Sequence, residues 1–342
     1  MKKKIFVTGA AGFIANQLTL ELLKTDCEII CIDDLNNYYS TQLKIDRLKR
    51  LGVYYDSSGN NKKYQSTTFP NLTFIKMKLE NKAGIDQLFM DNSFDYVIHL
   101  AGQAGVRYSI SNPYCYMESN ILGFLNILEA CRYHSVKHLI YASSSSVYGL
   151  NNHVPFTESE KTDQPVSLYA AFKKSNELMA HAYSALYRIP TTGFRFFTVY
   201  GPWGRPDMSP MLFSDAIKNG KTIKVFNNGN LFRDFTYIDD IVSGILCTLE
   251  CPPRQEECTS GIPTKIYNIG CGHRVPLMDF ISELERQMGK EVKKEFLPMQ
   301  KGDVYQTYAD SSRLFSEHGY KPHVQLHEGL KQFVSWYNDY YQ

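Results

Sequence analysis

The opening segment of the chain most narrows the choice of fold, because a short apolar strand runs into a glycine-containing turn and then into a helix. Ile5-Phe-Val7 predicts the strand, Thr8-Gly-Ala-Ala-Gly-Phe-Ile-Ala15 predicts the turn, and a leucine-rich helical pattern follows. A turn of this kind binds the pyrophosphate of a dinucleotide. Gly9 permits the tight bend, and Gly12 lets the phosphates approach the backbone at the helix N-terminus. The third position, which requires a small residue, is Ala15.

A second predicted strand, Glu28-Ile-Ile-Cys-Ile32, ends in Asp33, about twenty residues after the glycine turn. An acid at this place binds the adenosine ribose, and its charge repels the added phosphate of NADP. The two features together therefore predict a site for NAD. The alternative interpretation of Asp33-Asp34 is an ordinary turn at the end of a strand.

Strands and helices then alternate along the chain. Strands are predicted at Phe74-Ile75, Phe94 to Leu100, Lys137 to Ala142 and Thr191 to Phe197, and helices at about 114–134 and 168–187. Such alternation predicts a parallel, doubly wound α/β sheet. Residues 52–70 are polar without a clear period and predict an inserted surface loop. Pro202 and Pro206 stiffen the segment after the strand that begins at Thr191, and this segment is expected to leave the sheet and begin a cap.

Composition excludes several classes of partner. The chain has 37 basic and 35 acidic residues and no long block of one sign, so neither a nucleic-acid site nor a membrane-surface site is predicted. Its eight cysteines include no C-x-x-C pair, which argues against a zinc site or a disulfide framework and favours free thiols. The first residues run at once into the strand, without a signal-peptide pattern, so a cytoplasmic location is expected. The expected partner is a small molecule.

The segment Ser167-Leu-Tyr-Ala-Ala-Phe-Lys-Lys-Ser-Asn-Glu-Leu-Met179 places Tyr169 and Lys173 four residues apart on one face of a predicted helix. A phenol with a pKa of about 10 is a poor base at neutral pH, but a neighbouring ammonium stabilises its phenolate. Tyr169 would then take a proton from a hydroxyl group. Alone, the pair is more often an exposed helix that carries two common surface residues.

A run of hydroxyl side chains, Ser143-Ser-Ser-Ser-Val-Tyr-Gly149, follows the strand that begins at Lys137. In open α/β sheets ligands bind beyond the carboxyl ends of the strands, where these hydroxyls are expected. One of them would share a proton with Tyr169, although a serine run is usually just a polar turn. His99 lies on an apolar strand and is interpreted as a packed core histidine rather than a base.

Taken in order, these motifs resemble those of the extended short-chain dehydrogenase/reductase family, the NAD-dependent epimerases and dehydratases, over nearly the whole chain. Within that family they are most similar to the bacterial UDP-glucuronate 4-epimerases. The segments that carry the resemblance are Thr8-Gly-x-x-Gly, Asp33, His99 to Arg107, Ser143 to Gly149, Tyr169-x-x-x-Lys173, Arg195 to Met208, Arg233 to Asp240 and Gly302-Asp303. Two positions depart from the family: Ala15 replaces a usual glycine, and Lys78-Leu-Glu80 replaces an acid-containing pair that commonly meets the adenine.

The resemblance implies a Rossmann-type NAD-binding domain over residues 1–198, to which residues 236–270 return, and a smaller α/β domain for the nucleotide sugar over 199–235 and 271–342. It implies that NAD+ accepts a hydride from C4 of the sugar while Tyr169 removes the hydroxyl proton. The 4-keto sugar then turns over and takes the hydride back on its other face. Lys173 would hold the nicotinamide ribose and keep Tyr169 ionised, and Ser144 would hydrogen-bond the reacting oxygen. The residues implied at the cofactor are Gly9, Ala11, Gly12, Phe13, Ile14, Asp33, Leu100, Ala101, Gln103, Tyr169 and Lys173.

The resemblance also implies the sugar. Dehydratases of the family carry an Asp-Glu pair where this chain has Ser145-Ser146, and decarboxylases typically carry Asn at the Thr198 position and His at the Arg205 position. The hydroxyls of this chain instead suit a sugar carboxylate held by neutral hydrogen bonds. Arg233 resembles a diphosphate-binding arginine, and Asp303 resembles a contact to the uridine ribose. The residues implied at the substrate are Arg107, Ser144, Ser145, Ser146, Thr198, Arg205, Arg233 and Asp303.

Three other functions stay open on the sequence. One is a 4-epimerase of another UDP-hexose, such as UDP-GlcNAc, UDP-GlcNAcA or UDP-glucose, and another is UDP-glucuronate decarboxylase. The third is a catalytically silent NAD-binding protein, against which the joint presence of Tyr169, Lys173 and Ser144 speaks. A homodimer is expected through helices 114–134 and 168–187. Its predicted apolar face consists of Ile121, Phe124, Leu125 and Leu128, although burial within the monomer is the alternative.

Overall fold

The computed structural model of the chain describes residues 2–57, 59, 61–151, 153–258, 260–300 and 304–342. Its main feature is a sheet with the strand order β12-β7-β6-β5-β1-β2-β4-β3. The strands are β1 (Lys3–Thr8), β2 (Cys27–Asp33), β3 (Lys63–Gln65), β4 (Leu72–Lys76), β5 (Tyr96–His99), β6 (His138–Ser144), β7 (Thr191–Phe196) and β12 (Thr264–Ile269). From β1, the strands β2, β4 and β3 extend the sheet to one side, and β5, β6, β7 and β12 extend it to the other. All neighbouring strands pair in parallel except β3 with β4. The predicted doubly wound α/β fold is confirmed.

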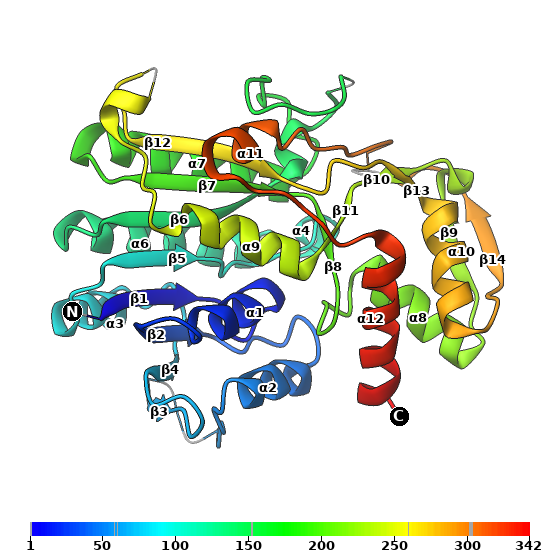
Figure 1. Cartoon of the computed structure of the whole chain (residues 1–342), viewed down its shortest axis with the longest axis horizontal. Helices are drawn as coiled ribbons and strands as arrows, with labels where there is room; N and C mark the ends of the chain where they lie inside the picture. The colour runs from blue at the N-terminus through cyan, green and yellow to red at the C-terminus, as the bar shows by residue number, and fades with distance from the viewer. Residues whose placement is uncertain (1, 58, 60, 152, 259, 301–303) are drawn as a thin grey trace.

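Helices cover both faces of this sheet (Figure 1). On one face lie α1 (Phe13–Leu22), α9 (Ile238–Leu249) and α11 (Ser312–His318), and on the other lie α3 (Lys82–Asp91), α6 (Gly123–Tyr133) and α7 (Leu168–Tyr187). Because both faces are covered, the side chains of the inner strands are buried almost throughout, and Phe6 and Val7 of β1 have no exposed surface. Helix α2 (Thr41–Arg50) lies beyond β2.

A smaller α/β part lies beside the carboxyl ends of the sheet strands, on the right of Figure 1. Strand β9 (Ile223–Phe226) pairs in parallel with β14 (Lys294–Leu297). Its helices are α8 (Ser209–Asn219), α10 (Leu277–Met288) and α12 (Leu326–Tyr340). The remaining short elements are α4 (Tyr108–Ser111), α5 (Tyr114–Tyr116), β8 (Thr198–Tyr200), β10 (Phe232–Arg233), β11 (Phe235–Tyr237) and β13 (Val275–Pro276).

The chain passes between the two parts more than once. Strand β8, which follows the main sheet, pairs in parallel with β11. Helix α9 then packs against α1, and β12 pairs with β7 at the edge of the main sheet. The domain boundaries drawn from the sequence remain a prediction.

The predicted loop over residues 52–70 is wrong at β3, which adds an antiparallel edge strand to β4. Tyr64 is buried there and packs against Tyr55 and Phe74, with ring centroids 5.4 and 6.2 Å apart, while its neighbours Lys63 and Gln65 are exposed. A strand of three residues in a polar segment is too short to produce a readable period.

The predicted helix over 114–134 is present as α5, a π-helical segment Met117–Leu122 and α6. Two of the four residues expected on its exposed apolar face, Phe124 and Leu128, are instead buried in the monomer. The Phe124 ring stacks on the His99 ring, with centroids 5.1 Å apart, and its centroid lies 5.3 Å from that of the Tyr141 ring. The apolar face of α6 therefore covers the sheet, as an amphipathic helix on a sheet does. His99 is the buried core histidine that the sequence predicts.

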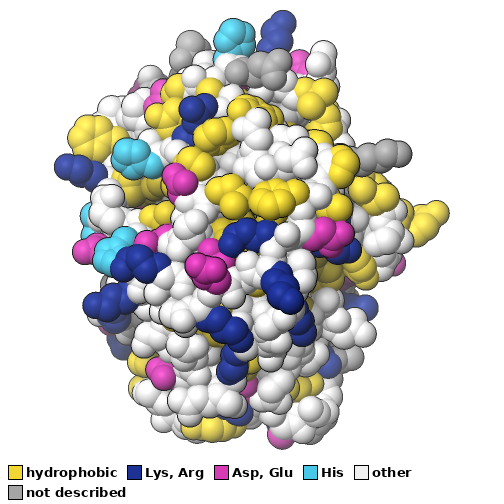
Figure 2. All heavy atoms as spheres, turned by 90° about the vertical axis from the view of Figure 1, so that its right-hand side faces the viewer, with side chains coloured by type: hydrophobic (Ala, Val, Ile, Leu, Met, Phe, Trp, Pro, Cys, Tyr) yellow, Lys and Arg dark blue, Asp and Glu magenta, His cyan; other side chains and the backbone are white. Residues whose placement is uncertain are grey.

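Figure 2 views the molecule from the side of the smaller part and shows basic side chains interspersed with acidic and uncharged ones. This agrees with the near balance of 37 basic and 35 acidic residues. Within the ranges given above, no helix combines the length and the apolar character needed to cross a membrane.

Candidate active site

A cavity of about 1200 Å³ lies between the carboxyl ends of the sheet strands and the smaller part. Residues of both the main sheet and the smaller part line this cavity, although they lie far apart in the sequence. Of the residues predicted at cofactor and substrate, those that line it are Gly9, Gly12, Phe13, Ile14, Asp33, Leu100, Ala101, Gln103, Arg107, Ser144, Ser145, Ser146, Tyr169, Lys173, Thr198, Arg205 and Arg233. Ala11 is buried behind the glycine turn. Asp303 lies outside the described residues.

One end of the cavity is a cradle at the point where the sheet order reverses. The turn after β1 and the segment after β5 meet there: a Cβ added to Gly9 would lie 2.9 Å from the backbone nitrogen of Ala101. Gly9 also has a φ of +82°, which glycine adopts without strain. Glycine is therefore required where these two backbone segments touch, and both segments form a wall of the cradle. Its shape fits a dinucleotide at the start of α1.

Asp33 closes the cradle at the end of β2. Its carboxylate accepts hydrogen bonds from the backbone nitrogens of Ala11, at 3.0 Å, and Leu35, at 2.8 Å. Burial and the nearby charge of Asp34 raise the pKa of Asp33 to about 6. Asp33 is thus a turn residue that orders the glycine turn, and it also faces the cavity where a ribose hydroxyl would lie.

Asn120 holds the segment that carries Gln103, a role that the sequence did not reveal. Its amide accepts from the backbone nitrogen of Gln103 at 2.7 Å and donates to the carbonyl of Gln103 at 2.9 Å. Asn176 of α7 donates in turn to the carbonyl of Asn120 at 2.7 Å. The sequence could have indicated this role, because Asn120 and Asn176 lie on the buried faces of two helices. A buried amide that lacks a hydrogen-bond partner is costly, so each is expected to have one.

Lys173 and Tyr169 both face the cavity from α7, as their spacing predicts. The Lys173 ammonium donates to the carbonyl of Ala142 at 2.9 Å, and burial lowers its pKa to about 8. Burial raises the pKa of Tyr169, while the positive charge of Arg205 and a hydrogen bond with Ser144 oppose that rise. The positive charge of Arg205 thus favours the Tyr169 phenolate, a contribution that the sequence did not indicate.

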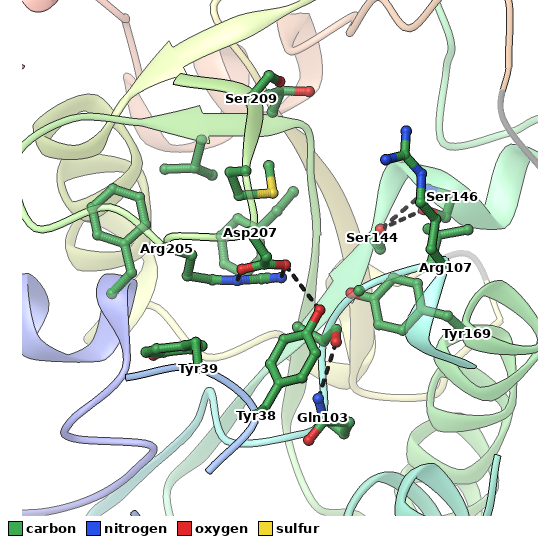
Figure 3. Close-up of a pocket in the computed structure, with 18 of the residues that line it drawn as sticks. Tyr38, Tyr39, Gln103, Arg107, Ser144, Ser146, Tyr169, Arg205, Asp207 and Ser209 are labelled. Carbon is green, nitrogen blue, oxygen red and sulfur yellow. Dashed lines mark hydrogen bonds and ion pairs between the residues drawn. The ribbon is translucent and has the colours of Figure 1, made fainter. Parts of the chain in front are cut away.

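The serine run ends β6 and turns into the cavity (Figure 3). The Ser144 hydroxyl accepts from the backbone nitrogen of Ser146 at 3.2 Å and donates to the Ser146 hydroxyl at 3.1 Å. Just before it, Ser143 donates to the carboxylate of Glu177 at 2.7 Å. Because Glu177 lies on α7, this bond ties the serine run to the helix that carries Tyr169.

On the substrate side, Thr198 begins β8, and its backbone nitrogen donates to the carbonyl of Asp234 at 3.1 Å. Arg205 forms an ion pair with Asp207, in which Nε lies 3.0 Å from Oδ1. The guanidinium near Trp203 belongs to Arg50 and lies 5.0 Å from a Trp203 ring centroid. Tyr38 donates a hydrogen bond to Asp207 at 3.0 Å (Figure 3).

Two further arginines line the cavity. The guanidinium of Arg107 is exposed and lies 5.3 Å from the Phe226 ring centroid. Arg233 donates to the carbonyls of Phe232, at 2.8 Å, and Tyr305, at 3.3 Å. Lys221, which pairs with Asp215 at 2.8 Å, and Lys224 line the same cavity, and cationic side chains of this kind suit a phosphate group. Nowhere in the described ranges do three His, Cys, Asp or Glu side chains group so as to hold a metal ion.

Comparison with known proteins gives consistent matches. The sequence profile of the NAD dependent epimerase/dehydratase family matches residues 5–270. Protein CapI of Staphylococcus aureus is 48% identical over 99% of this chain and 99% of its own, and a probable UDP-glucuronate 4-epimerase of Rhizobium meliloti is 40% identical over 99% and 98%. The crystal structure of UDP-glucuronic acid 4-epimerase from Bacillus cereus, in complex with UDP-glucuronic acid and NAD, superposes with a TM-score of 0.86. It is 33% identical and covers 99% of this chain and 100% of that one.

Proposed function

The chain belongs to the NAD-dependent epimerase/dehydratase family, and from that premise we propose that it is a UDP-glucuronate 4-epimerase, which interconverts UDP-glucuronate and UDP-galacturonate. One observation carries the proposal. A single cavity joins the dinucleotide cradle at Gly9 and Asp33 to Tyr169, to the hydroxyl-rich wall of the serine run and to Thr198.

NAD is the cofactor that the cradle fits, and when bound it supplies the acceptor and later the donor of the C4 hydride. The glycine turn at Gly9 and Gly12 would hold its pyrophosphate, and Asp33 its adenosine ribose. The segment Leu100 to Gln103 would line its nicotinamide half, with Lys173 at the second ribose. The Lys173 ammonium already has one fixed acceptor in Ala142, so its direction is set before a ligand arrives.

Tyr169 is the proposed acid and base of the reaction. It removes the proton of the C4 hydroxyl as the sugar is oxidised, and it returns that proton when the 4-keto sugar is reduced on its other face. Ser144 lies within hydrogen-bonding reach of Tyr169 and would hold the same oxygen. The positive charge of Arg205 favours the phenolate that the first step requires.

The hydroxyl groups on the substrate side favour a uronic acid. Ser144 is nearly buried, and Ser145, Ser146 and Thr198 are partly buried, so several neutral donors face the cavity together. They would orient a carboxylate without a buried ion pair. Ser145 and Ser146 also stand where an acid and base would be needed for elimination of water, so dehydration is not proposed. Arg233, and Asp303 by resemblance, would bind the UDP part.

We also propose a homodimer formed by the outer faces of α6 and α7. Exposed apolar side chains gather on these helices and the preceding π-helical segment: Met117, Leu122, Tyr133, Leu178 and Leu186 are between 45% and 70% exposed. We propose that these exposed residues, and not the buried Phe124 and Leu128, form the dimer interface. A cytoplasmic location stays a prediction, supported by eight cysteines that are all free thiols.

The test is product analysis with the purified protein. UDP-glucuronate should yield UDP-galacturonate, of the same mass but separable by chromatography, and Tyr169→Phe should form it at least about 100-fold more slowly. UDP-glucose, UDP-GlcNAc and UDP-GlcNAcA serve as competing substrates. Faster turnover of one of these sugars, or release of a UDP-pentose from UDP-glucuronate by the parent enzyme, would replace the proposed function by the corresponding alternative.

A further inference from the structure

We infer that Tyr38 and Asp207 are positioning residues that hold the Arg205 guanidinium beside Tyr169 and thereby support proton transfer. The inference rests on the proposed function, because it deepens the role of the same site. It adds to the reaction two residues to which the motifs assigned no role, one from the β2–α2 connection and one from the loop after β8. Figure 3 shows both side chains with Arg205 and with the hydroxyl of Tyr169 turned toward them.

The first support is the geometry of the Arg205–Asp207 pair. Nε of Arg205 donates to one carboxylate oxygen of Asp207 at 3.0 Å, and Nη2 donates to the other. The two side chains are only 22% and 26% exposed. Such a fork holds the plane and direction of the guanidinium, which one bond would not. Asp207 therefore decides where the charge of Arg205 lies.

The second support is that Asp207 is itself held. The Tyr38 hydroxyl donates to Oδ2 of Asp207 at 3.0 Å. The Tyr38 ring lies 4.7 Å from that of Tyr108, and its backbone nitrogen donates to the side chain of Asn36 at 3.2 Å. Lys44 donates to the same Asn36 side chain at 2.8 Å. Tyr38 is therefore an ordered anchor and not a free surface phenol.

The third support lies on the other side of Arg205. Arg47 of α2 is fully buried and donates to the carbonyls of Trp203, at 2.6 Å, and Gly204, at 3.1 Å. Trp203 has a φ of +64°, a strained value for a residue with a side chain, so this backbone shape needs such a partner. The loop is thus fixed immediately before Arg205 by Arg47 and immediately after it through Tyr38. Both anchors come from the segment that follows Asp33.

The position of Arg205 affects the pKa of the Tyr169 hydroxyl. Arg205 opposes the effect of burial on the pKa of Tyr169, and Asp207 acts in the opposite sense. Other titratable side chains near Tyr169 are Tyr116, whose ring centroid lies 6.2 Å from that of Tyr169, and Lys173, which lines the same cavity from the same helix. Loss of the Tyr38 bond leaves every one of these charges in place and loosens only the position of Arg205. Tyr38→Phe is therefore the cleanest probe.

The experiment is a double-mutant cycle with UDP-glucuronate as substrate. Tyr38→Phe and Asp207→Asn are measured alone and in an Arg205→Gln background. We expect kcat to fall about tenfold in Asp207→Asn and a few-fold in Tyr38→Phe, because each loses a bond to a charged group. In the Arg205→Gln background each change should alter kcat less than about twofold, since residues that act through Arg205 have nothing left to position. Equal losses in both backgrounds would show a general structural role and overturn the inference.

A second readout decides the matter even if Arg205→Gln has no measurable rate. The acid limb of kcat/KM against pH reports the ionisation of the proposed base, and it should move to higher pH in Tyr38→Phe, with NAD content unchanged. An unmoved limb overturns the inference. The matched control is Tyr64→Phe at the sheet edge, which loses a tyrosine–carboxylate bond of 2.6 Å to Asp56 and should keep the parent profile. If the parent enzyme epimerises another UDP-sugar, the proposed substrate fails, and the same cycle is measured with that sugar.

Discussion

Glu177 and Arg195 form a buried, two-pronged ion pair that joins the catalytic helix to the sheet. Nε of Arg195 donates to Oε1 of Glu177 at 2.8 Å and Nη2 donates to Oε2 at 2.9 Å, and the side chains are 3% and 1% exposed. Ser143 donates to the same carboxylate, so the pair also fixes the start of the serine run. Removal of one partner would leave the other charge buried and uncompensated.

We therefore predict that Glu177→Gln lowers the free energy of unfolding by roughly 3–5 kcal/mol. Burial alone would raise the pKa of Glu177, but the hydrogen bonds and charge of Arg195 outweigh it, and the pKa lies below the usual 4.5. Because the folded-state pKa is depressed, the stabilisation is complete above pH 4.5 and is lost as the pH falls through the folded-state value. Thermal unfolding at several pH values should show that the difference in unfolding free energy between parent and variant becomes smaller as the pH falls below 4.5.

The control for Glu177 is Glu21→Gln, which breaks an exposed pair with Lys24 and should cost less than about 1 kcal/mol. The double variant Glu177→Leu with Arg195→Met should recover stability relative to Glu177→Gln, because no unpaired charge remains buried. A Glu177→Gln protein as stable as the parent at neutral pH would contradict the assignment.

Tyr169→Phe should reduce epimerisation by a factor of about 100 to 10,000, because a proton transfer in the transition state is lost. The ring stays, so the fold and NAD binding should remain, as circular dichroism and bound-nucleotide analysis would show. Activity within a few-fold of the parent would remove Tyr169 from the role of base.

Asp33→Ala should weaken NAD binding by about tenfold and reduce the discrimination against NADP, because a charged acceptor at the ribose is removed. The variant also loses the acceptor of the Ala11 backbone nitrogen, so the glycine turn becomes less ordered. Dissociation constants for both dinucleotides, measured on protein freed of nucleotide, test this. If both bind as they do to the parent, Asp33 is a turn residue only.

Thr198→Asn and Arg205→His should slow epimerisation and release a UDP-4-keto-pentose or UDP-pentose as a side product. Oxidation of UDP-glucuronate at C4 makes a β-keto acid, which loses carbon dioxide when its carboxylate bond aligns with the ketone π system. Thr198 and the serine run are expected to restrain that alignment, and Arg205 is expected to order Thr198 and its loop. Mass spectrometry detects the product, and Tyr169→Phe, which cannot oxidise C4, is the blank. Variants that only lose rate would refute the restraint.

Leu178→Glu and Leu186→Glu should shift the protein from dimer toward monomer, because a charge would be buried in the proposed interface of α7. These side chains are 59% and 70% exposed in the monomer. Met90→Glu, at a 63% exposed position on α3, is the control and should leave the mass unchanged. Light scattering at micromolar concentration measures the mass. A monomeric parent protein would count against pairing through these helices.

What the sequence determined by itself is local. The glycine turn after β1, the acid at the end of β2 and the four-residue step from Tyr169 to Lys173 each depend on neighbours along the chain, and each appears where its pattern predicted. Helix and strand periods set which side chains share a face, and parallel strands bring their carboxyl ends to one edge. These rules predict that Gly9, Asp33 and Tyr169 lie at one edge of the sheet, and all three line the same cavity.

Only the tertiary structure decided which of these residues touch. Tyr38 meets Asp207 across 169 positions of sequence, so no local period could pair them. The apolar face of α6 that carries Phe124 and Leu128 is expected both for a dimer interface and for a helix that packs on its own sheet. Only the folded structure shows that the monomer buries these two residues. The sequence implied a substrate contact for Arg205, and only the path of the loop between Arg47 and Tyr38 shows that its guanidinium is turned to Asp207 and Tyr169. Contacts of this kind depend on how distant segments are brought together, and that is a property of the folded chain as a whole.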